Sequence, residues 1–92
     1  MIERDQTSSF PLIAEYPDVN GGYPVIAMTR IAVRLVVQAF QELGSLEDTI
    51  EAFPQLTGEQ VQAALDYYHE YPQRVDEDTE RNATALDALR AR

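Results

Sequence analysis

Residues 20–31, NGGYPVIAMTRI, and residues 45–65, SLEDTIEAFPQLTGEQVQAAL, determine the fold that this sequence predicts. The first stretch joins an Asn-Gly-Gly turn to a short apolar strand and a Thr-Arg step. The second contains two helices, because Ser45 and Thr57 are favourable N-cap residues and Gln60 completes a capping box with Thr57. About four residues connect these helices, a length typical of helix-turn-helix proteins.

A short β-ribbon is predicted on the N-terminal side, over residues 10–30. An apolar run at residues 10–13 and a second at 25–27 supply the strands, and three prolines in the segment disfavour a helix and keep the strands short. Between the strands, Asn20-Gly21 can supply the positive φ angles of a two-residue hairpin turn.

The helix between the two quoted stretches is predicted from about Ala32 to Leu43, where Gly44 ends it. Its apolar stripe follows helical spacing and consists of Leu35, Val36, Ala39, Phe40 and Leu43. In the next two helices the residues predicted to face inward are Leu46, Ile50, Phe53, Val61, Ala64, Leu65 and Tyr68.

Together these elements predict a mainly α protein of the α+β type. One domain covers residues 1–72, with the β-ribbon at 10–30 and a three-helix core at 31–71, and an acidic tail with a C-terminal helix occupies 73–92. From the pattern alone, a helix-turn-helix core and a plain three-helix bundle without a recognition role are equally favoured.

The tail begins with a cluster of acidic residues, Asp76, Glu77, Asp78 and Glu80, interpreted as a solvated run of charge. Its alternating oxygens match a calcium loop poorly, because Arg81 stands where that loop needs glycine, so no metal site is predicted. A thin seam with 4-3-4-3 spacing consists of Val75, Thr79, Asn82, Leu86 and Leu89. A helix with so little apolar surface has marginal stability on its own in water. We therefore expect it either to dock on a partner or to fold on binding.

Charge limits the function classes. The 92 residues carry a formal net charge of −9, and all seven basic residues are arginines. Such a chain is repelled by nucleic acid at long range and attracted to a basic protein. Because the sequence has no cysteine, no long apolar run and no signal-peptide core, we expect a cytoplasmic protein without a membrane segment.

Catalytic residues are not evident. His69 is the single histidine, and its position near the end of a helix favours surface exposure or a helix-dipole contact. Ser8, Ser9 and Ser45 lack the context of a nucleophile, and no phosphate loop or dinucleotide fingerprint occurs. We therefore expect no enzyme and no cofactor.

The order of these motifs resembles the DUF433 family of small bacterial proteins, over about half of the chain, residues 20–65. The first block of matching residues is Gly21, Gly22, Pro24, Val25, Ile26, Thr29, Arg30, Ile31 and Val33. The second block is Gly44, Leu46, Glu47, Ile50, Phe53, Pro54, Leu56, Thr57, Glu59, Val61, Ala63, Ala64 and Leu65.

Three residues depart from the family pattern. Tyr23 replaces a lysine and removes one positive charge from the ribbon. Met28 replaces the glycine before Thr-Arg, which questions a positive-φ turn there. Ala32 replaces a proline and only relaxes the start of the helix. The first two departures weaken a role in binding nucleic acid.

The resemblance implies a homeodomain-like or winged-helix-like helix-turn-helix core and a VapB-type antitoxin that neutralises a PIN-like ribonuclease toxin and represses its own operon. The residues expected to contact the toxin lie in the tail: Val75, Arg81, Leu86, Leu89 and Arg90. An arginine could pair with the metal-binding carboxylates of such a toxin. Alternatively, these arginines make only i,i+4 pairs with neighbours such as Glu77 and Asp87.

A sequence-specific DNA-binding regulator that acts without a toxin is the alternative function. Its contact residues would be Arg30, Arg34 and Gln62, of which Gln62 can read adenine. Residues 20–71 contain only these two arginines against seven acidic residues, so DNA binding by a complex whose partner adds positive charge is favoured over DNA binding by the free chain. Arg30 could instead pair with an acidic neighbour and hold the ribbon.

A third possibility is a dimeric module of unrelated purpose, and a homodimer is expected in any case. The ribbon edge with Phe10, Leu12, Ile13 and Tyr23 could build its symmetric interface.

Overall fold

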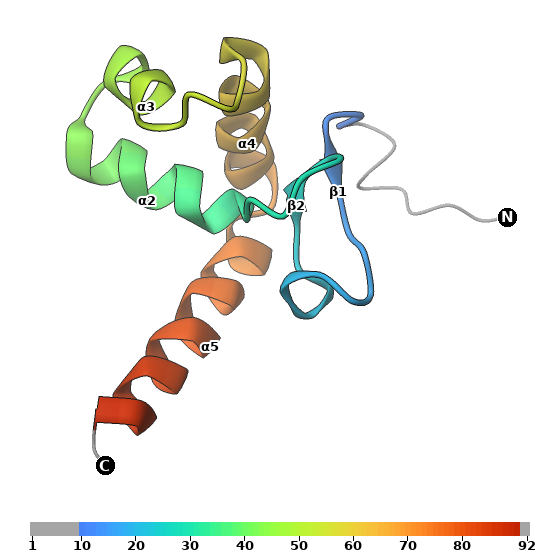
Figure 1. Ribbon diagram of the computed structural model, residues 1–92, viewed down its shortest axis with the longest axis vertical. Helices are drawn as coiled ribbons and strands as arrows, with labels where there is room; N and C mark the ends of the chain where they lie inside the picture. Colours follow the sequence, from blue (N-terminus) through green and yellow to red (C-terminus); the bar gives the residue numbers. More distant parts are fainter. Residues whose placement is uncertain (1–9, 91–92) are drawn as a thin grey trace, which may run out of the picture.

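The described part of the chain contains six elements of regular structure and one 3-10 turn (Figure 1). The computed structural model describes residues 10–90, and for 84–90 only the backbone. The elements in chain order are β1 (Ile13–Ala14), η1 (Asn20–Gly22), β2 (Val25–Ile26), α2 (Val33–Leu43), α3 (Leu46–Ala52), α4 (Gly58–Glu70) and α5 (Pro72–Arg90). The predicted fold class, mainly helical with a short N-terminal ribbon, is confirmed.

The ribbon is antiparallel, and Ile13 pairs with Ile26 and Ala14 with Val25. The predicted two-residue hairpin turn at Asn20-Gly21 is wrong, because residues 15–24 separate the strands. Both residues do have positive φ angles, 54° and 63°, but they form part of the 3-10 turn η1 instead of a hairpin turn. Pro24 follows η1 and lacks the N–H that a longer strand pairing would need, so β2 begins only after it.

Helix α2 begins at Val33, one residue later than predicted, and ends at Gly44, whose φ of 83° gives a left-handed cap. Its buried residues are Val33, Val36 and Val37. The predicted stripe is therefore rotated, and Leu35 and Leu43 are exposed. Val33 and Val37 continue the stripe of Val36 and Phe40 at i, i+3 and i+4 spacing, and the three valines of this stripe belong to the core.

Both predicted caps are present. The Ser45 hydroxyl accepts a hydrogen bond from the Asp48 amide at 3.1 Å, and Thr57 and Gln60 bond reciprocally as a capping box. The inward face of α4 is Val61, Ala64 and Tyr67 rather than the predicted set with Leu65 and Tyr68, which are half-buried. Leu46, predicted to face inward, is exposed.

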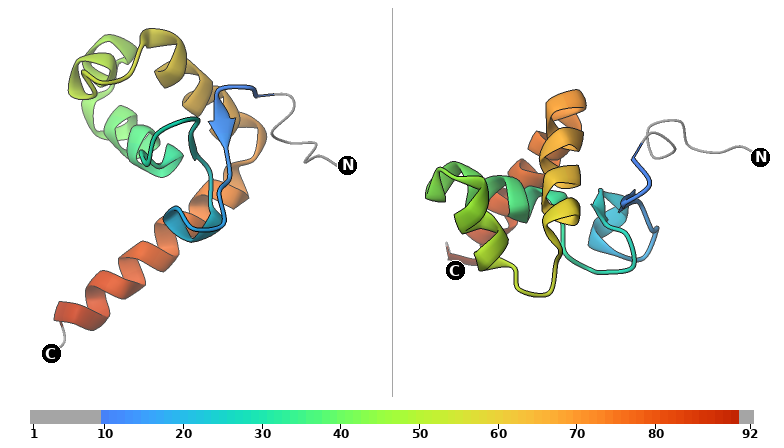
Figure 2. Two further views of the ribbon diagram at one scale, coloured as in Figure 1. Left: turned by 45° about the vertical axis from the view of Figure 1, so that its right-hand side comes forward. Right: turned by 90° about the horizontal axis from the view of Figure 1, so that it is seen from above.

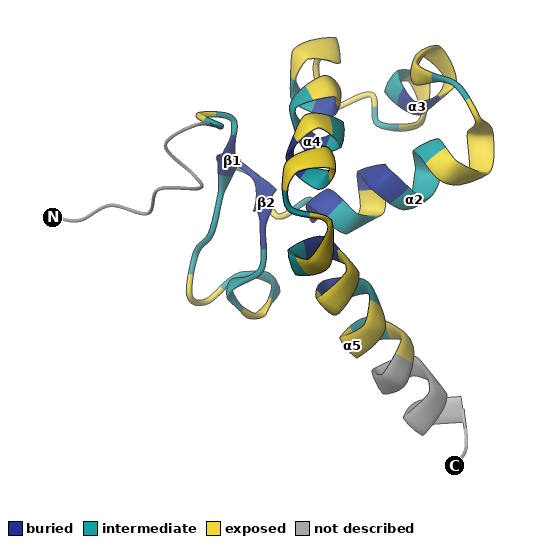
Figure 3. Ribbon diagram, turned by 180° about the vertical axis from the view of Figure 1, so that it is seen from behind, coloured by how far each residue is buried: buried dark blue, intermediate teal, exposed yellow. Residues whose placement is uncertain are grey.

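One hydrophobic core joins the ribbon to the helices of the described chain (Figure 3). Its buried members are Ile13, Ile26, Val33, Val36, Val37, Leu56, Val61, Ala64, Tyr67 and Val75. Phe10 packs its ring edge against Tyr67 and Tyr71, with ring centroids 5.4 and 6.1 Å apart. The ribbon and α5 thus share the core of the three central helices.

Helix α5 starts with Pro72, a residue suited to the first helical position because its missing N–H has no partner to lose there. Val75 and Asp78 are both 1% exposed, so the first turns of this helix belong to the folded body. The left view of Figure 2 shows α5 passing η1 and extending beyond the other elements. Within residues 10–90, no helix has both the length and the apolar character needed to cross a membrane.

Candidate partner-binding surface

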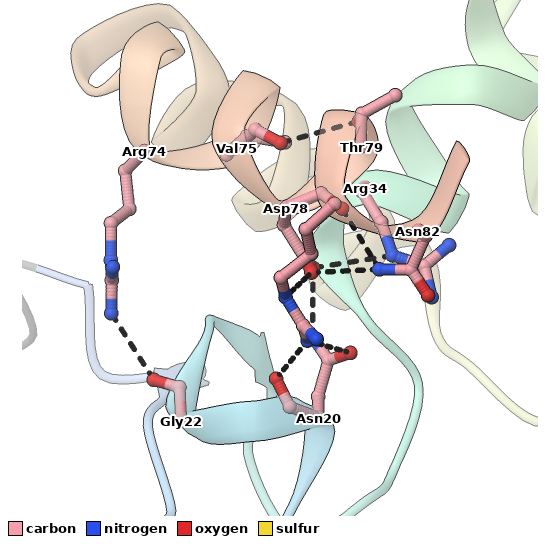
Figure 4. Close-up of polar contacts among 9 residues, drawn as sticks. Asn20, Gly22, Arg34, Arg74, Val75, Asp78, Thr79 and Asn82 are labelled. Carbon is pink, nitrogen blue, oxygen red and sulfur yellow. Dashed lines mark hydrogen bonds and ion pairs between the residues drawn. The ribbon is translucent and has the colours of Figure 1, made fainter. Parts of the chain in front are cut away.

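A buried carboxylate connects three distant segments of the chain (Figure 4). Asp78 on α5 accepts hydrogen bonds from the side-chain amides of Asn20 in η1, at 2.8 Å, and Asn82, at 3.0 Å. The Nε atoms of Arg34 on α2 and Arg81 lie 3.2 and 3.0 Å from its oxygens. We call these five residues the Asp78 cluster.

The Asp78 cluster satisfies a charge that would otherwise be costly to bury. A carboxylate removed from water needs both an opposite charge and hydrogen bonds, and Asp78 has two guanidinium groups and two amides. The prediction that Asp78 belongs to a solvated run is therefore wrong. Its helical phase explains the difference, since Asp78 lies one turn after the buried Val75 on the same face of α5.

Arg34, predicted to contact DNA, binds Asp78 and Asn82 within this cluster. Its side chain is largely buried, and its Nη2 also donates to Asn82 Oδ1 at 3.0 Å. Because the guanidinium already has internal partners, it does not reach a phosphate or a base in this conformation. Arg34 as a DNA contact stays a prediction, and it would require the guanidinium to leave Asp78 and Asn82.

The other two predicted DNA contacts are exposed but differ in their surroundings. Arg30 makes no ion pair with any residue that the structure describes, so the alternative that it holds the ribbon through an acidic neighbour has no support there. Gln62 donates from Nε2 to Asp66 Oδ1 on the same helix at 2.9 Å. The exposed face of α4 around Gln62 also carries Glu59, so this face is acidic.

Two of the predicted toxin contacts, at the start of the tail, contact other residues of the same chain. Val75 lies in the core, because the turn of α5 that carries it packs against α2 and α4. Arg81 pairs with Asp78, and its Nη2 donates to the backbone oxygen of Asn20 at 2.7 Å. Toxin contact by these two residues stays a prediction, and it would compete with their contacts inside the fold. Leu86, Leu89 and Arg90 lie outside the residues whose side chains the structure describes.

Tyr23, where the family pattern has lysine, fastens the ribbon to α5. The guanidinium carbons of Arg74 and Arg81 lie 4.2 and 4.7 Å from the centre of its ring. Arg74 also pairs with Glu15 at 3.4 Å and donates to the Gly22 oxygen at 3.2 Å. An aromatic ring thus provides what a lysine could not, a surface on which two arginines stack.

The residues expected to form a symmetric interface mostly face inward. Ile13 is buried in the core, Phe10 packs on two tyrosines, and Tyr23 is covered by arginines. Only the half-buried Leu12 has no such contact among the described residues. The ribbon edge therefore offers little apolar surface to a second copy.

Met28 has the positive φ angle of a turn, although the family pattern has glycine at this position and a side chain disfavours that angle. Its φ is 67°, its side chain is 91% exposed, and its amide donates to the Tyr16 hydroxyl at 3.0 Å. Thr29 closes the turn, because its hydroxyl donates to the Ile26 oxygen at 2.8 Å and accepts from the Ile31 amide. The turn is therefore fixed by hydrogen bonds rather than by glycine.

An apolar groove of about 420 Å³ lies between α2 and α4 at the start of α5. Its apolar walls are Val37, Phe40, Leu65, Tyr68 and Pro72. At one end the Tyr68 hydroxyl donates to Asp76 on α5 at 2.9 Å. This hydrogen bond to a carboxylate, together with partial burial, raises the pKa of Tyr68 above its usual value of 10.0, so the hydroxyl keeps its proton at neutral pH.

Beside this groove, α5 presents an acidic face. A shallow hollow along the helix is lined by Gln73, Asp76, Glu77, Thr79 and Glu80. Among the residues that the structure describes, no three His, Cys, Asp or Glu side chains are grouped so that they could hold a metal ion. The groove and this face adjoin, because Asp76 lines the hollow and also accepts the hydrogen bond from Tyr68.

Sequence reasoning missed the Asp78 cluster and the acidic end of the groove. The positions of Val75, Asp78 and Asn82 at i, i+3 and i+7 gave a local signal that Asp78 shares the inward face. The partners Asn20 and Arg34 are far away in sequence, and no local pattern connects them to α5.

Residues 13–68 match the family described as "Protein of unknown function (DUF433)". The crystal structure of a DUF433 member protein from Anabaena variabilis ATCC 29413 is similar, with a TM-score of 0.61 and 31% sequence identity, over 80% of this chain and 78% of that chain. No curated protein is significantly similar. The matched residues contain Asn20 and Arg34, whereas Asp78, Arg81 and Asn82 lie beyond them.

Proposed function

This chain belongs to the DUF433 family, and we propose that it is an antitoxin-like protein that binds and neutralises a PIN-like ribonuclease toxin encoded beside it. The toxin role comes from the resemblance of the sequence to antitoxin-like members, and the geometry supports the more general part of the proposal, a protein partner. The chain has no catalytic role in this proposal.

The observation that carries the proposal is the distribution of charge. Among the described side chains of α2 to α5, the exposed acidic residues are Glu42, Glu47, Asp48, Glu51, Glu59, Asp66, Glu70, Asp76, Glu77 and Glu80. Of the arginines among residues 10–83, three have carboxylate partners within the fold, which leaves Arg30. Such a surface accelerates encounter with a basic protein and opposes the approach of a nucleic acid.

Repression of the operon is assigned to the complex rather than to the free chain. Gln62 is bonded to Asp66 and Arg34 is held by Asp78, so the free chain lacks the positive face that duplex DNA requires. A basic toxin would supply that charge, and Arg30 would then be this chain's own contact with the phosphates. A DNA-binding regulator that acts without a toxin is the less supported candidate.

Coexpression with the adjacent reading frame tests the proposal. We expect the two products to copurify, the neighbour to inhibit growth when it is expressed alone, and this chain to restore growth. A complex that dissociates more readily as salt is raised would agree with a charged interface. If the neighbour is harmless and the two products do not associate, the antitoxin proposal is wrong.

A mobility-shift experiment on promoter DNA near physiological salt separates the two candidate functions. The free chain should leave the duplex unshifted, and the complex should shift it. Arg30→Ala should weaken DNA binding by the complex but leave toxin neutralisation unchanged, which provides a matched control. Tight binding by the free chain would favour the DNA-binding regulator.

A further inference from the structure

The groove between α2 and α4 is an uncovered apolar surface with its own charged border. Val37 and Phe40 line one wall and Leu65 and Tyr68 the other, and its volume is about 420 Å³. Two helices that leave an apolar channel between them provide the geometry in which a third helix can pack. The occupant is therefore expected to present apolar side chains along one face of a helix.

The acidic residues beside the groove favour an occupant with positive charge. Asp76 accepts the hydrogen bond from Tyr68 and so lies directly at the end of the groove, and Glu77 and Glu80 extend the same acidic face along α5. All three carboxylates are exposed, and none of them has an ion-pair partner within residues 10–83. Basic side chains beside the apolar ones would neutralise this face.

A second copy of this chain is the weaker occupant. In a twofold contact each copy would bring the same groove and the same acidic face to the interface. Carboxylates would then face carboxylates, which opposes association of a chain whose net charge is −9.

We infer that the groove and the acidic face of α5 bind an amphipathic helix with lysine or arginine beside its apolar residues, contributed by a partner protein. This inference deepens the proposed function and rests on it for the identity of the partner. The surface itself is formed by the free chain, so it can be tested without the toxin.

The first test uses a peptide probe of defined composition. A helical peptide of leucine and lysine, with the leucines on one face, is titrated into the isotope-labelled full chain and followed by NMR. We expect shifts at Phe40, Leu65 and Tyr68 and at the acidic face of α5. The same peptide with glutamate in place of lysine should bind at least about tenfold more weakly. Equal binding of both peptides, or shifts confined to another face, would overturn the inference.

Two pairs of variants locate the site. Leu65→Arg should weaken binding of the lysine peptide about tenfold or more, whereas Leu35→Arg should not, because Leu35 is exposed on a different face of α2. Glu77→Lys with Glu80→Lys should reverse the preference between the two peptides. The matched pair is Asp48→Lys with Glu51→Lys, which has the same spacing on α3 at the far end of the molecule from α5 (Figure 1). Thermal unfolding of each variant verifies that it is folded.

The same variants distinguish this inference from the proposed function. If the product of the adjacent gene binds the wild type, Leu65→Arg and the α5 charge pair equally well, the inference is wrong and the antitoxin proposal stands. If that product does not bind the wild type, while the lysine peptide still occupies the groove, the antitoxin proposal is wrong and the inference stands.

Discussion

The junction among α2, α3 and α4 and the junction of α5 with α2 and η1 are stabilised by different kinds of interaction. In the first, residues such as Val36, Val61 and Ala64 exclude water. In the second, one apolar residue, Val75, is accompanied by the Asp78 cluster, in which a buried carboxylate holds two arginines and two amides. An apolar junction tolerates loss of a methyl group gradually, whereas a buried charge that loses one partner leaves the other uncompensated.

The largest effect is expected from Asp78→Ala. Removal of the carboxylate leaves the largely buried Arg34 without its counter-charge, so the free energy of unfolding should fall by about 3–5 kcal/mol. Denaturant unfolding measures this loss. Glu77→Ala, an exposed acid one residue earlier, should change stability by less than about 0.5 kcal/mol. A similar small change for both variants would mean that the Asp78 cluster does not hold α5.

Val75→Ala and Val61→Ala compare the two junctions directly. Both side chains are essentially unexposed in the same core, so each truncation should lower the free energy of unfolding by about 2 kcal/mol. If α5 were a tail that forms only on a partner, Val75→Ala would have no measurable cost in the free chain while Val61→Ala would keep its full effect.

The glycines of η1 test how closely that turn approaches α5. Gly21 and Gly22 both have positive φ, and a methyl group on Gly21 would lie 2.8 Å from Nη2 of Arg81, whereas one on Gly22 would meet nothing within 4 Å. Gly22→Ala should cost about 1 kcal/mol for the backbone alone. Gly21→Ala should cost about 2 kcal/mol, because Arg81 must also give up its bond to Asn20. Equal costs would show that the approach is unimportant.

The smallest expected effect is a gain in stability from Met28→Gly. Met28 has a φ of 67° with its side chain in solvent, so its conformation costs about 1 kcal/mol with no packing to offset it. Met28→Gly removes this strain but adds freedom to the unfolded chain, and stability should rise by about 0.5 kcal/mol. A loss of stability in thermal unfolding would mean that the methionine side chain contributes contacts that offset the strain.

The contrast between the junctions also explains which parts of the fold could be predicted from the sequence. Caps at Ser45, Thr57 and Gly44 are local signals, and they placed the helix ends within about one residue. The rotation of α2 was missed because Leu35 and Leu43 are as apolar as the valines that are buried instead. Periodicity identifies a helix more securely than it identifies which of two adjacent apolar stripes faces inward.

The candidate site was predicted less well for a physical reason. Arg34 and Arg81 were assigned to external partners because their internal partner, Asp78, is distant in sequence or was interpreted as solvated. Tyr23 was regarded as a lost positive charge, although it stacks with two arginines. A charged residue in a sequence does not reveal whether its counter-charge is inside or outside the molecule.

This result changes how the tail should be tested. Deletion of residues 73–92 would remove Val75 and Asp78 and would destabilise the fold itself, so a loss of toxin binding could not be assigned to the tail. A chain that ends after Ala83 retains the Asp78 cluster and removes Leu86, Leu89 and Arg90. Toxin neutralisation by that shorter chain measures the contribution of these three residues separately.

The central claim is that α5 is part of the free protein, so that the surface beside it exists before a partner arrives. Amide hydrogen exchange of the free chain tests this claim most directly. The amides of residues 78–82 should be protected to within about tenfold of those in the middle of α4, because both would open only when the shared core opens. Exchange of residues 78–82 at the rate of an unfolded chain, with α4 still protected, would contradict the claim.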